Sequence, residues 1–370
     1  MKWFGRKSAR DAARPALSRQ ASVSAIGEWP RSYEAQVREA YLANPVAQRA
    51  VKMVSEGVGG APLTGSDPAL VALVTARSGG QALTETLASQ LLLHGNAYVQ
   101  ILTDGEGRLA ELFALRPERV TVEPDAGGWP VAYRYRVGEH VARLAAEDGG
   151  GRPAVAHIKA FHPVDDHYGL GCLGAAAGAV AVHNAAARWN KALLDNAARP
   201  SGALVYDPGD GGCLAPDQFA RLKGEMEAAF AGAANAGRPM LLEGGLKWQA
   251  MSLTPADMDF VGLKAAAARE IALAFGVPPM LMGLPGDAAY ANYREANRAL
   301  WRLAILPLAD KILGGIAQAL SGWFPGARLA VDLDRVTALS EDRERLWRQV
   351  SGAAFLTDDE KRAILGLGPA

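Results

Sequence analysis

Three glycines near the middle of the chain have the spacing of a phosphate-binding turn. Gly169, Gly171 and Gly174 form the pattern G-x-G-x-x-G directly before a predicted helix. Such glycines bind a dinucleotide when they form a tight strand-to-helix turn, because the backbone then approaches the pyrophosphate. Here seven residues separate the preceding predicted strand from Gly169, and Asp195 falls inside a helical pattern instead of ending a second strand. We therefore favour a turn that lets a helix pack closely, and keep a nucleotide-binding enzyme as the alternative.

A second group of side chains has the chemistry of metal ligands. His157, His162 and His167 lie close in sequence to Asp165 and Asp166. Imidazole and carboxylate groups bind zinc or iron. The run from His162 to His167 is turn-like, however, and strand alternation would place the donors on different faces. A hydrogen-bonded surface loop is the favoured interpretation, and we expect neither a metal nor a cofactor.

No other catalytic arrangement is present in the sequence. It lacks a nucleophile elbow, a Walker lysine loop and a Cys-x-x-Cys pair. The two cysteines, Cys172 and Cys213, give no disulfide framework and fit a reducing compartment. The chain is therefore expected not to be an enzyme.

Composition limits the kind of partner. The 370 residues are 49% hydrophobic, which is enough for a real core, and two or three domains are expected. Lys+Arg and Asp+Glu both number 39, so the formal net charge is zero. A protein that grips nucleic acid over its whole surface is usually basic. Any contact with nucleic acid must then be local, weak or made through repeated subunits.

The sequence predicts no secretion signal and no membrane span. The most apolar candidate, residues 174–187, is interrupted by His183 and Asn184. Residues 1–40 are expected to form a flexible arm, basic in its first twenty positions. The favoured interpretation is a solvated terminus, and the alternative is an arm that touches a neighbouring subunit or nucleic acid.

The order of predicted elements indicates an α+β fold. Up to about residue 173 the patterns predict helices over 44–57, 67–78 and 82–94, then antiparallel strands over 97–102, 109–115, 119–123, 131–137 and 155–161. Beyond it they predict a helix over 174–198, a strand over 203–206, a helix from Pro216, a hairpin of 239–242 with 247–253, a helix over 254–275 and another over 293–320. A strand over 328–333 and two final helices follow, the last with a capping box at Thr357.

The connection between the two longest of these helices has an unusual composition. Residues 277–286 carry no Lys, Arg, Asp, Glu or His, and consist largely of Met, Leu, Gly and Pro. An apolar loop makes van der Waals contact without holding a ligand electrostatically; a connection buried in the core is the alternative. Pro307 is expected to kink the helix that follows. On the helix from Ser340 the mixed charges are read as a solvated face, with Leu346, Trp347 and Val350 packed inside.

At this point the sequence resembles the portal proteins of tailed phages, in particular the compact type of long-tailed phages. Residues 269–283 read REIALAFGVPPMLMG, and residues 237–248 read GRPMLLEGGLKW. Further runs match the family in the same order along the chain, at 94–98, 115–120, 157–159, 168–171, 199–202, 290–292 and 365–369. The resemblance covers nearly the whole chain from about Tyr41. Ala291 and Gly171 stand where the family often has serine, and the short chain would leave a small C-terminal crown.

The resemblance implies an α+β portal fold with a wing, a stem, a clip, a kinked long helix and a crown. The implied parts are the wing at 41–173, stem helices at 174–199 and 255–276, the clip at 200–254, the tunnel loop at 277–292, the long kinked helix with a wing strand at 293–337, and the crown at 338–370. The implied functional residues are Met280, Leu281, Met282, Gly283, Leu284, Pro285 and Gly286 in the tunnel loop, Lys264 and Arg269 in the stem, Gln218, Arg221, Lys223 and Glu225 in the clip, and Pro307 at the kink.

The resemblance also implies a structural role and a set of partners. It implies a ring, usually of twelve copies, at one capsid vertex, through which double-stranded DNA passes without sequence specificity. The implied partners are the terminase large subunit, the major capsid protein and a head–tail adaptor, with assembly in the bacterial cytoplasm and no membrane contact. Another ring or adaptor protein of a phage-like particle is a further alternative. An infectious phage, a prophage and a gene transfer agent remain open as the source.

Overall fold

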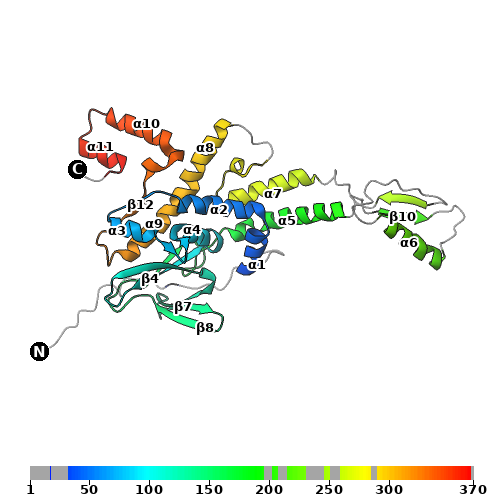
Figure 1. The fold of residues 1–370 in the computed structure, drawn as a ribbon, viewed down its shortest axis with the longest axis horizontal. Helices are drawn as coiled ribbons and strands as arrows, with labels where there is room; N and C mark the ends of the chain where they lie inside the picture. Colours follow the sequence, from blue (N-terminus) through cyan, green and yellow to red (C-terminus); the bar gives the residue numbers. More distant parts are fainter. Residues whose placement is uncertain are drawn as a thin grey trace. The chain divides into compact units, whose positions relative to one another are not determined.

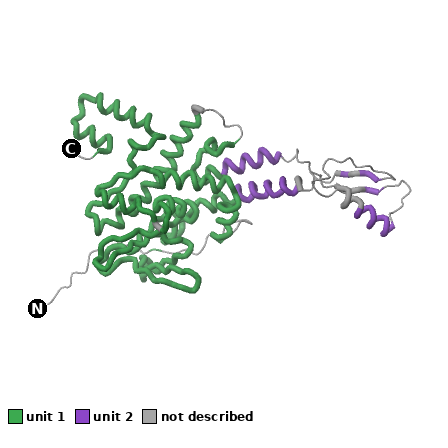
Figure 2. The backbone as a smooth tube through the Cα atoms, in the orientation of Figure 1, with its two compact units in different colours: residues 1–177, 271–370 green, residues 178–270 purple. Residues whose placement is uncertain are grey.

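The computed structural model describes residues 17, 32–195, 202–206, 215–230, 246–250, 259–284 and 290–367. The chain forms two compact units (Figure 2). Unit 1 combines residues 1–177 with residues 271–370, and unit 2 consists of residues 178–270. Unit 1 is thus built from two segments distant in sequence, and unit 2 is inserted between them.

The first helices of unit 1 begin and end at residues whose types predict it. Asn44 accepts hydrogen bonds from the N–H groups of Val46 and Ala47, both at 3.0 Å, and Gly95 ends a helix with a φ of 83°. The helices are α1 (Tyr33–Val37), the π-helical η1 (Arg38–Leu42), α2 (Pro45–Gly59), α3 (Pro68–Thr75) and α4 (Leu83–His94). The predicted helix over 67–78 is wrong at its end, because β2 (Arg77–Ser78) pairs there with β3 (Gln81–Ala82).

Two three-stranded antiparallel sheets follow α4, in the orders β5-β4-β9 and β6-β7-β8. The strands are β4 (Asn96–Thr103), β5 (Leu109–Leu115), β6 (Val120–Pro124), β7 (Pro130–Val137), β8 (His140–Ala145) and β9 (Val155–Lys159). Strand β8 was not predicted from the sequence. It is an edge strand whose side chains are almost all exposed, so it lacks the alternation of buried and exposed residues that reveals a strand.

The core of unit 1 lies on both faces of the sheet β5-β4-β9. On one face Tyr98 and Val155 pack with Val122 and Tyr133 of the other sheet. On the opposite face lie α4 and α9 (Leu306–Leu320), which contact β4 and β9 respectively (Figure 1). Both faces of β4 are therefore covered, which explains why Ala97, Tyr98 and Val99 are all buried in succession.

The C-terminal part of the chain returns to unit 1 through helices and one short strand. It contains the 3₁₀ helix η4 (Pro279–Met282), α8 (Tyr290–Leu300), the π-helical η5 (Trp301–Ile305), α9, β12 (Leu329–Val331), the 3₁₀ turns η6 (Leu333–Arg335) and η7 (Thr337–Leu339), α10 (Ser340–Ser351) and α11 (Asp358–Leu365). Strand β12 pairs antiparallel with β1 (Leu63–Gly65), which joins the two segments of unit 1. The predicted capping box is confirmed, since Thr357 and Glu360 exchange hydrogen bonds at the start of α11.

One helical run has the length and apolar composition of a membrane span, contrary to the sequence-based expectation. It covers Asn292–Leu320. In the structure its second half is a core helix, because Ile312, Leu313, Ile316 and Leu320 are completely or almost completely buried inside unit 1. Burial in a protein core accounts for this composition as well as a bilayer would.

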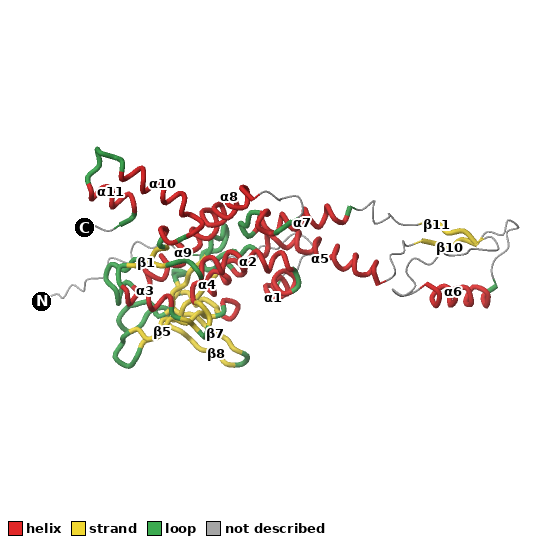
Figure 3. Tube along the Cα trace, turned by 45° about the horizontal axis from the view of Figure 1, so that its top comes forward, coloured by secondary structure: helices red, strands yellow, loops and turns green. Residues whose placement is uncertain are grey.

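Unit 2 contains a pair of helices and a small α/β part. Its helices are α5 (Leu173–Asp195), which begins in unit 1, and α7 (Phe260–Ala274), which ends there. Strands β10 (Gly202–Tyr206) and β11 (Leu246–Ala250) form an antiparallel pair, with α6 (Pro216–Phe230) alongside (Figure 3). Strand β11 pairs with β10, and residues 239–242, its predicted hairpin partner, lie outside the described residues.

Candidate functional site

The G-x-G-x-x-G turn packs against the chain's own backbone. A Cβ atom added at Gly171 would lie 2.5 Å from the carbonyl oxygen of Leu93 and 2.9 Å from the nitrogen of Gly95. Asn96 holds the same turn, because its Oδ1 accepts the N–H of Gly169 at 2.7 Å and its Nδ2 donates to the Gly169 oxygen at 3.2 Å. The turn thus joins the start of α5 to the α4–β4 junction, and protein backbone fills the space that a pyrophosphate would need.

The histidines near this turn are held by other partners. His157 Nε2 donates to Asn96 Oδ1 at 3.0 Å, and the ring stacks on Tyr98 with centroids 4.2 Å apart. His167 Nε2 donates to the carbonyl oxygen of Gly128, and Asp165 accepts the N–H groups of His167 and Tyr168. Among the residues that the structure describes, no three His, Cys, Asp or Glu side chains are placed to hold a metal ion.

Burial sets the protonation of this cluster. Desolvation, and then the charge of Lys159, lowers the pKa of His157 from 6.5 to about 3. Burial also raises the pKa of Tyr133 to about 12, and it raises the pKa of Tyr98 still further. All three groups are therefore neutral at physiological pH, which suits side chains held away from water.

Helices α5 and α7 run antiparallel within unit 2. Trp189 stacks on Phe260 with ring centroids 4.4 Å apart, and one to two turns further along the pair the charge of Lys264 acts on His183. Burial, and then Lys264, lowers the pKa of His183. Lys264 and Arg269, both predicted as stem residues, are half-buried on α7.

Helix α7 ends where predicted. It begins at Phe260, where Asp259 accepts the N–H of Gly262 at 3.1 Å, whereas the predicted start at 254–257 lies outside the described residues. At its end Gly276 has a φ of 69°, and Val277 N–H donates to the Ala272 oxygen at 2.9 Å. This is a Schellman cap, for which glycine is the usual residue.

The predicted tunnel loop is partly helical. Pro279–Met282 forms η4, which contacts α2 and α8 and is followed by Gly283 with a φ of 68°. The side chains of Met280, Leu281, Met282 and Leu284 are half-buried, and Gly283 is exposed. Pro285 and Gly286 lie outside the described residues. The apolar connection predicted over 277–286 thus contains a 3₁₀ turn at 279–282 that packs on two helices, and its role as a tunnel loop stays a prediction.

The long helix changes its hydrogen-bonding pattern directly before Pro307. Residues Trp301–Ile305 are π-helical between α8 and α9. A proline has no N–H and clashes with the carbonyl of the residue four positions earlier, which here is Leu303. A π-turn at this place relieves that clash and is a recognised cause of helix kinks.

The predicted clip residues lie on α6. Gln218 Oε1 accepts the N–H of Ala215 at 3.1 Å, so this side chain caps the helix. Arg221 and Lys223 are exposed, and the side chain of Glu225 lies outside the part of the chain that the structure describes. Capping gives Gln218 a local structural role in addition to the docking role that the resemblance implies.

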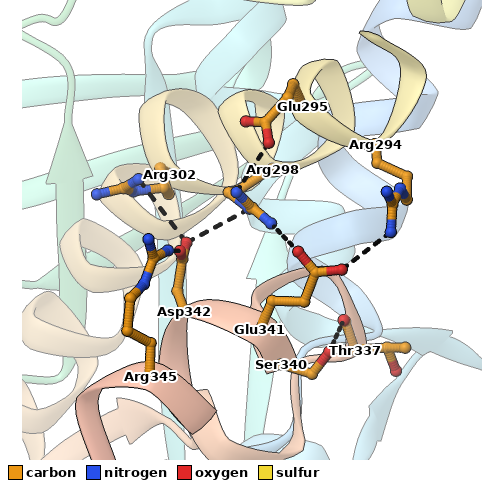
Figure 4. A network of polar contacts seen from close by, with 9 residues as sticks. All are labelled: Arg294, Glu295, Arg298, Arg302, Thr337, Ser340, Glu341, Asp342 and Arg345. Atoms are coloured by element: carbon orange, nitrogen blue, oxygen red, sulfur yellow. Dashed lines mark hydrogen bonds and ion pairs between the residues drawn. The ribbon is translucent and has the colours of Figure 1, made fainter. Parts of the chain in front are cut away.

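The sequence pattern predicts a solvated face for the charges of α10. Several of these charges instead form ion pairs with another helix. Glu341 accepts from Arg294 at 3.0 Å and from Arg298 at 2.7 Å, and Asp342 lies 3.4 Å from Arg298 (Figure 4). We call the set shown there the α8–α10 network. Its ion-pairing members are Arg294, Glu295, Arg298, Arg302, Glu341, Asp342 and Arg345.

The spacing of the arginines in the sequence could have indicated one side of this network. The arginines at 294, 298 and 302 recur every four residues and so share one helical face. Their partners on α10 could not be identified without the fold. Trp347 was also misplaced: its side chain is 38% exposed, and its indole N–H donates to Asp334 at 3.1 Å. Val350 is buried as expected.

Comparison with known proteins identifies the chain's relatives. A family model described as phage portal protein matches residues 45–366. An uncharacterized protein of Rickettsia felis is 38% identical over 90% of this chain and 88% of its own length. The probable portal protein of Streptomyces phage phiC31 is 26% identical over 96% of this chain and 80% of its own length.

A solved structure is closer in sequence. A chain in the neck of a native gene transfer agent (GTA) particle, computed with C12 symmetry, is 49% identical to this chain. The match covers 93% of this chain and 96% of that one, with a TM-score of 0.69. These comparisons agree with the mixed helix and sheet fold, and they leave the nucleotide-binding enzyme without support.

Proposed function

The chain belongs to the phage portal protein family, and from that premise we propose that it assembles into a ring that forms a DNA channel at one vertex of a capsid. The observation that carries the proposal is the 49% identity, over nearly the full length, with a chain in a C12-symmetric neck. The proposed ring accordingly has twelve copies. The same relative, closer than the phage phiC31 protein at 26% identity, favours a particle of the gene transfer agent type.

In this proposal, residues 41–173 are the wing, and helices α5 and α7 are the stem. The 23 residues of α5 span about 35 Å, which suits a channel wall. Lys264 and Arg269 are proposed to act in the stem, and residues 200–254 are proposed to be the clip. There Gln218, Arg221, Lys223 and Glu225 would face the terminase large subunit and later a head–tail adaptor.

The proposed tunnel loop, residues 277–292, fits a channel through which DNA slides. Its residues from 280 to 286 carry no charge, and tight neutralisation of phosphates would hold DNA in place. Zero formal net charge on the whole chain fits the same need. Pro307 would bend the helix at 293–337 behind this loop, and residues 338–370 would be the crown.

The proposed location is the portal vertex of the particle, in contact with the major capsid protein, after assembly in the cytoplasm of the bacterial host. DNA would pass in both directions, inward during packaging and outward during ejection, without sequence recognition. The energy would come from the terminase ATPase. An external source of energy fits this chain, because the glycines and histidines that could suggest an enzyme site pack on backbone or hold structural hydrogen bonds.

The experiment that tests the proposal is imaging of the purified chain together with native mass spectrometry. A closed ring with a central hole is expected, and twelve copies of the 38.9 kDa chain (12 × 38.9) give about 467 kDa. Labelling of the chain in isolated particles should then mark a single vertex. A label spread over all vertices or along the tail would overturn the portal assignment.

A further inference from the structure

Arg298 differs from the other arginines of the α8–α10 network in its burial. Its side chain is 14% exposed, against 60% for Arg294 and 62% for Arg302. Exposed ion pairs contribute little, because water and salt screen them. A partly buried guanidinium with several carboxylates is different, since losing it leaves those carboxylates uncompensated. Arg298 is thus the residue on which the contact between α8 and α10 chiefly depends.

Three carboxylates converge on this one guanidinium (Figure 4). Arg298 Nη1 lies 2.9 Å from Glu295 on its own helix, whereas Nη2 lies 2.7 Å from Glu341 and Nε lies 3.4 Å from Asp342. Two of the three partners belong to α10, more than forty residues later in the sequence. The nitrogen facing Asp342 and the oxygen opposite it make no hydrogen bond, so that pair is ionic only.

Helix α8 lies between the C-terminal helices and the turn η4. It contacts η7, which leads directly into α10, and it also contacts η4. Arg298 stands eight residues after Tyr290, the first residue of α8, which is about 12 Å along the helix axis. A helix is stiff over that length. A displacement of α8 at Arg298 would therefore move the surface against which η4 packs.

From these contacts we propose that Arg298 is a positioning residue that couples α10 to the turn Pro279–Met282 through α8. This inference rests on the proposed function, because the loop that the C-terminal helices would position faces a channel only in a portal ring. The coupling itself is a property of unit 1 and can be measured whether or not the ring forms.

Hydrogen exchange of the full-length chain, in the assembly that it forms, tests the coupling. The reporters are the amides of Leu281 and Gly283, which donate to Pro278 and Met280 within and beside η4. Glu341→Gln removes a carboxylate on α10 and touches neither η4 nor the covalent structure of α8. It is expected to speed exchange at both reporters on the order of tenfold, which corresponds to ~1.4 kcal/mol of local stability.

Two control variants should leave the reporters unchanged, and two further variants should reproduce the effect of Glu341→Gln. Glu344→Gln makes the same chemical change on the same helix, but Glu344 pairs within α10, with Arg348. It should leave the reporters at wild-type rates. Arg298→Gln should reproduce the effect of Glu341→Gln, and the double variant should add little, because both changes break one interaction. Arg302→Gln, at an exposed pair 3.8 Å long, should have little effect.

The coupling would be overturned if Glu341→Gln loosened α10 alone and left Leu281 and Gly283 unchanged. It would equally be overturned if Glu344→Gln accelerated these amides as much as Glu341→Gln did. Failure of the ring to form would contradict the proposed function and leave the exchange result to decide the coupling by itself.

Discussion

Asn96 and Gly169 are joined by two hydrogen bonds between one side-chain amide and one peptide backbone, across 73 residues of sequence. Asn96 is 1% exposed, and its Oδ1 also accepts from His157. A single buried amide therefore orders the end of α4, strand β9 and the turn that leads into α5. The glycines of that turn serve backbone packing, and they need Asn96 beside them.

Asn96→Ala is expected to lower the free energy of unfolding by about 2–4 kcal/mol, because buried groups of Gly169 and His157 lose their partner. Urea unfolding at a fixed protein concentration measures it. Asn292→Ala, at an exposed position of α8, is the control and should change stability by less than about 0.5 kcal/mol. Equal midpoints for wild type and Asn96→Ala would show that the turn does not depend on this side chain.

Two glycines of the same turn should respond in opposite directions. Gly171→Ala places a Cβ atom against the backbone of Leu93 and is expected to destabilise the chain by about 1–3 kcal/mol. At Gly174, the second residue of α5, an added Cβ atom would meet nothing within 4 Å apart from its chain neighbours and the backbone of its own helix. Gly174→Ala is therefore expected to stabilise by about 0.5–1 kcal/mol. Thermal unfolding of both variants checks the pair, and a destabilised Gly174→Ala would contradict the open space seen there.

The buried histidine predicts a pH dependence of stability. The folded pKa of His157, about 3, lies below its unfolded value of 6.5, so between these values the unfolded chain binds the extra proton. The contribution of neutral His157 to the free energy of unfolding is fully present above pH 6.5. It is lost as the pH falls toward 3, with a slope of up to about 1.4 kcal/mol per pH unit.

Urea midpoints between pH 7 and pH 4 measure that slope. His157→Gln keeps an N–H donor for Asn96 without a titrating ring, and it should flatten the curve. His140→Gln, on the exposed strand β8, is the matched substitution and should retain the wild-type slope. A wild-type slope in His157→Gln would assign the pH dependence to other groups.

Local signals in the sequence were sufficient for the helix ends and insufficient for contacts between distant segments. Asn44, Gly95, Gly276 and Thr357 mark helix boundaries because caps act on the next few residues. Strand β8 was missed, since an exposed edge strand has little burial pattern to reveal it.

In the candidate site, too, local features could be predicted from the sequence, whereas contacts between distant segments could not. The glycine spacing was visible, but its partner Asn96 lies 73 residues away and was not predicted. The importance of Arg298 was likewise not predictable from the sequence, because two of its three carboxylate partners lie on α10, more than forty residues away. The uncharged loop was recognised from composition, whereas the 3₁₀ turn within it depends on packing against α2 and α8.

Pro307 predicts the shape of the long helix. Pro307→Ala restores an N–H group and removes the ring that clashes with the carbonyl of Leu303, so the π-helical segment Trp301–Ile305 is expected to become α-helical. A structure of the variant ring by electron cryomicroscopy would show this change. Pro45→Ala, at the first position of α2, should leave its helix unchanged, since the missing N–H has no partner there. A π-segment that persists in Pro307→Ala would assign its cause to packing.

Met282→Glu tests the proposed channel loop directly. In a twelve-membered ring it would place twelve carboxylates near the DNA path, and each would repel a phosphate ~4 Å away by about 1 kcal/mol in water. DNA protected inside particles is therefore expected to fall about tenfold or more. Met282→Gln has nearly the same size without charge and should retain most packaging. Both variants should form normal rings, because the Met282 side chain is only half-buried. Wild-type DNA content in Met282→Glu particles with intact rings would place the constriction elsewhere in the chain.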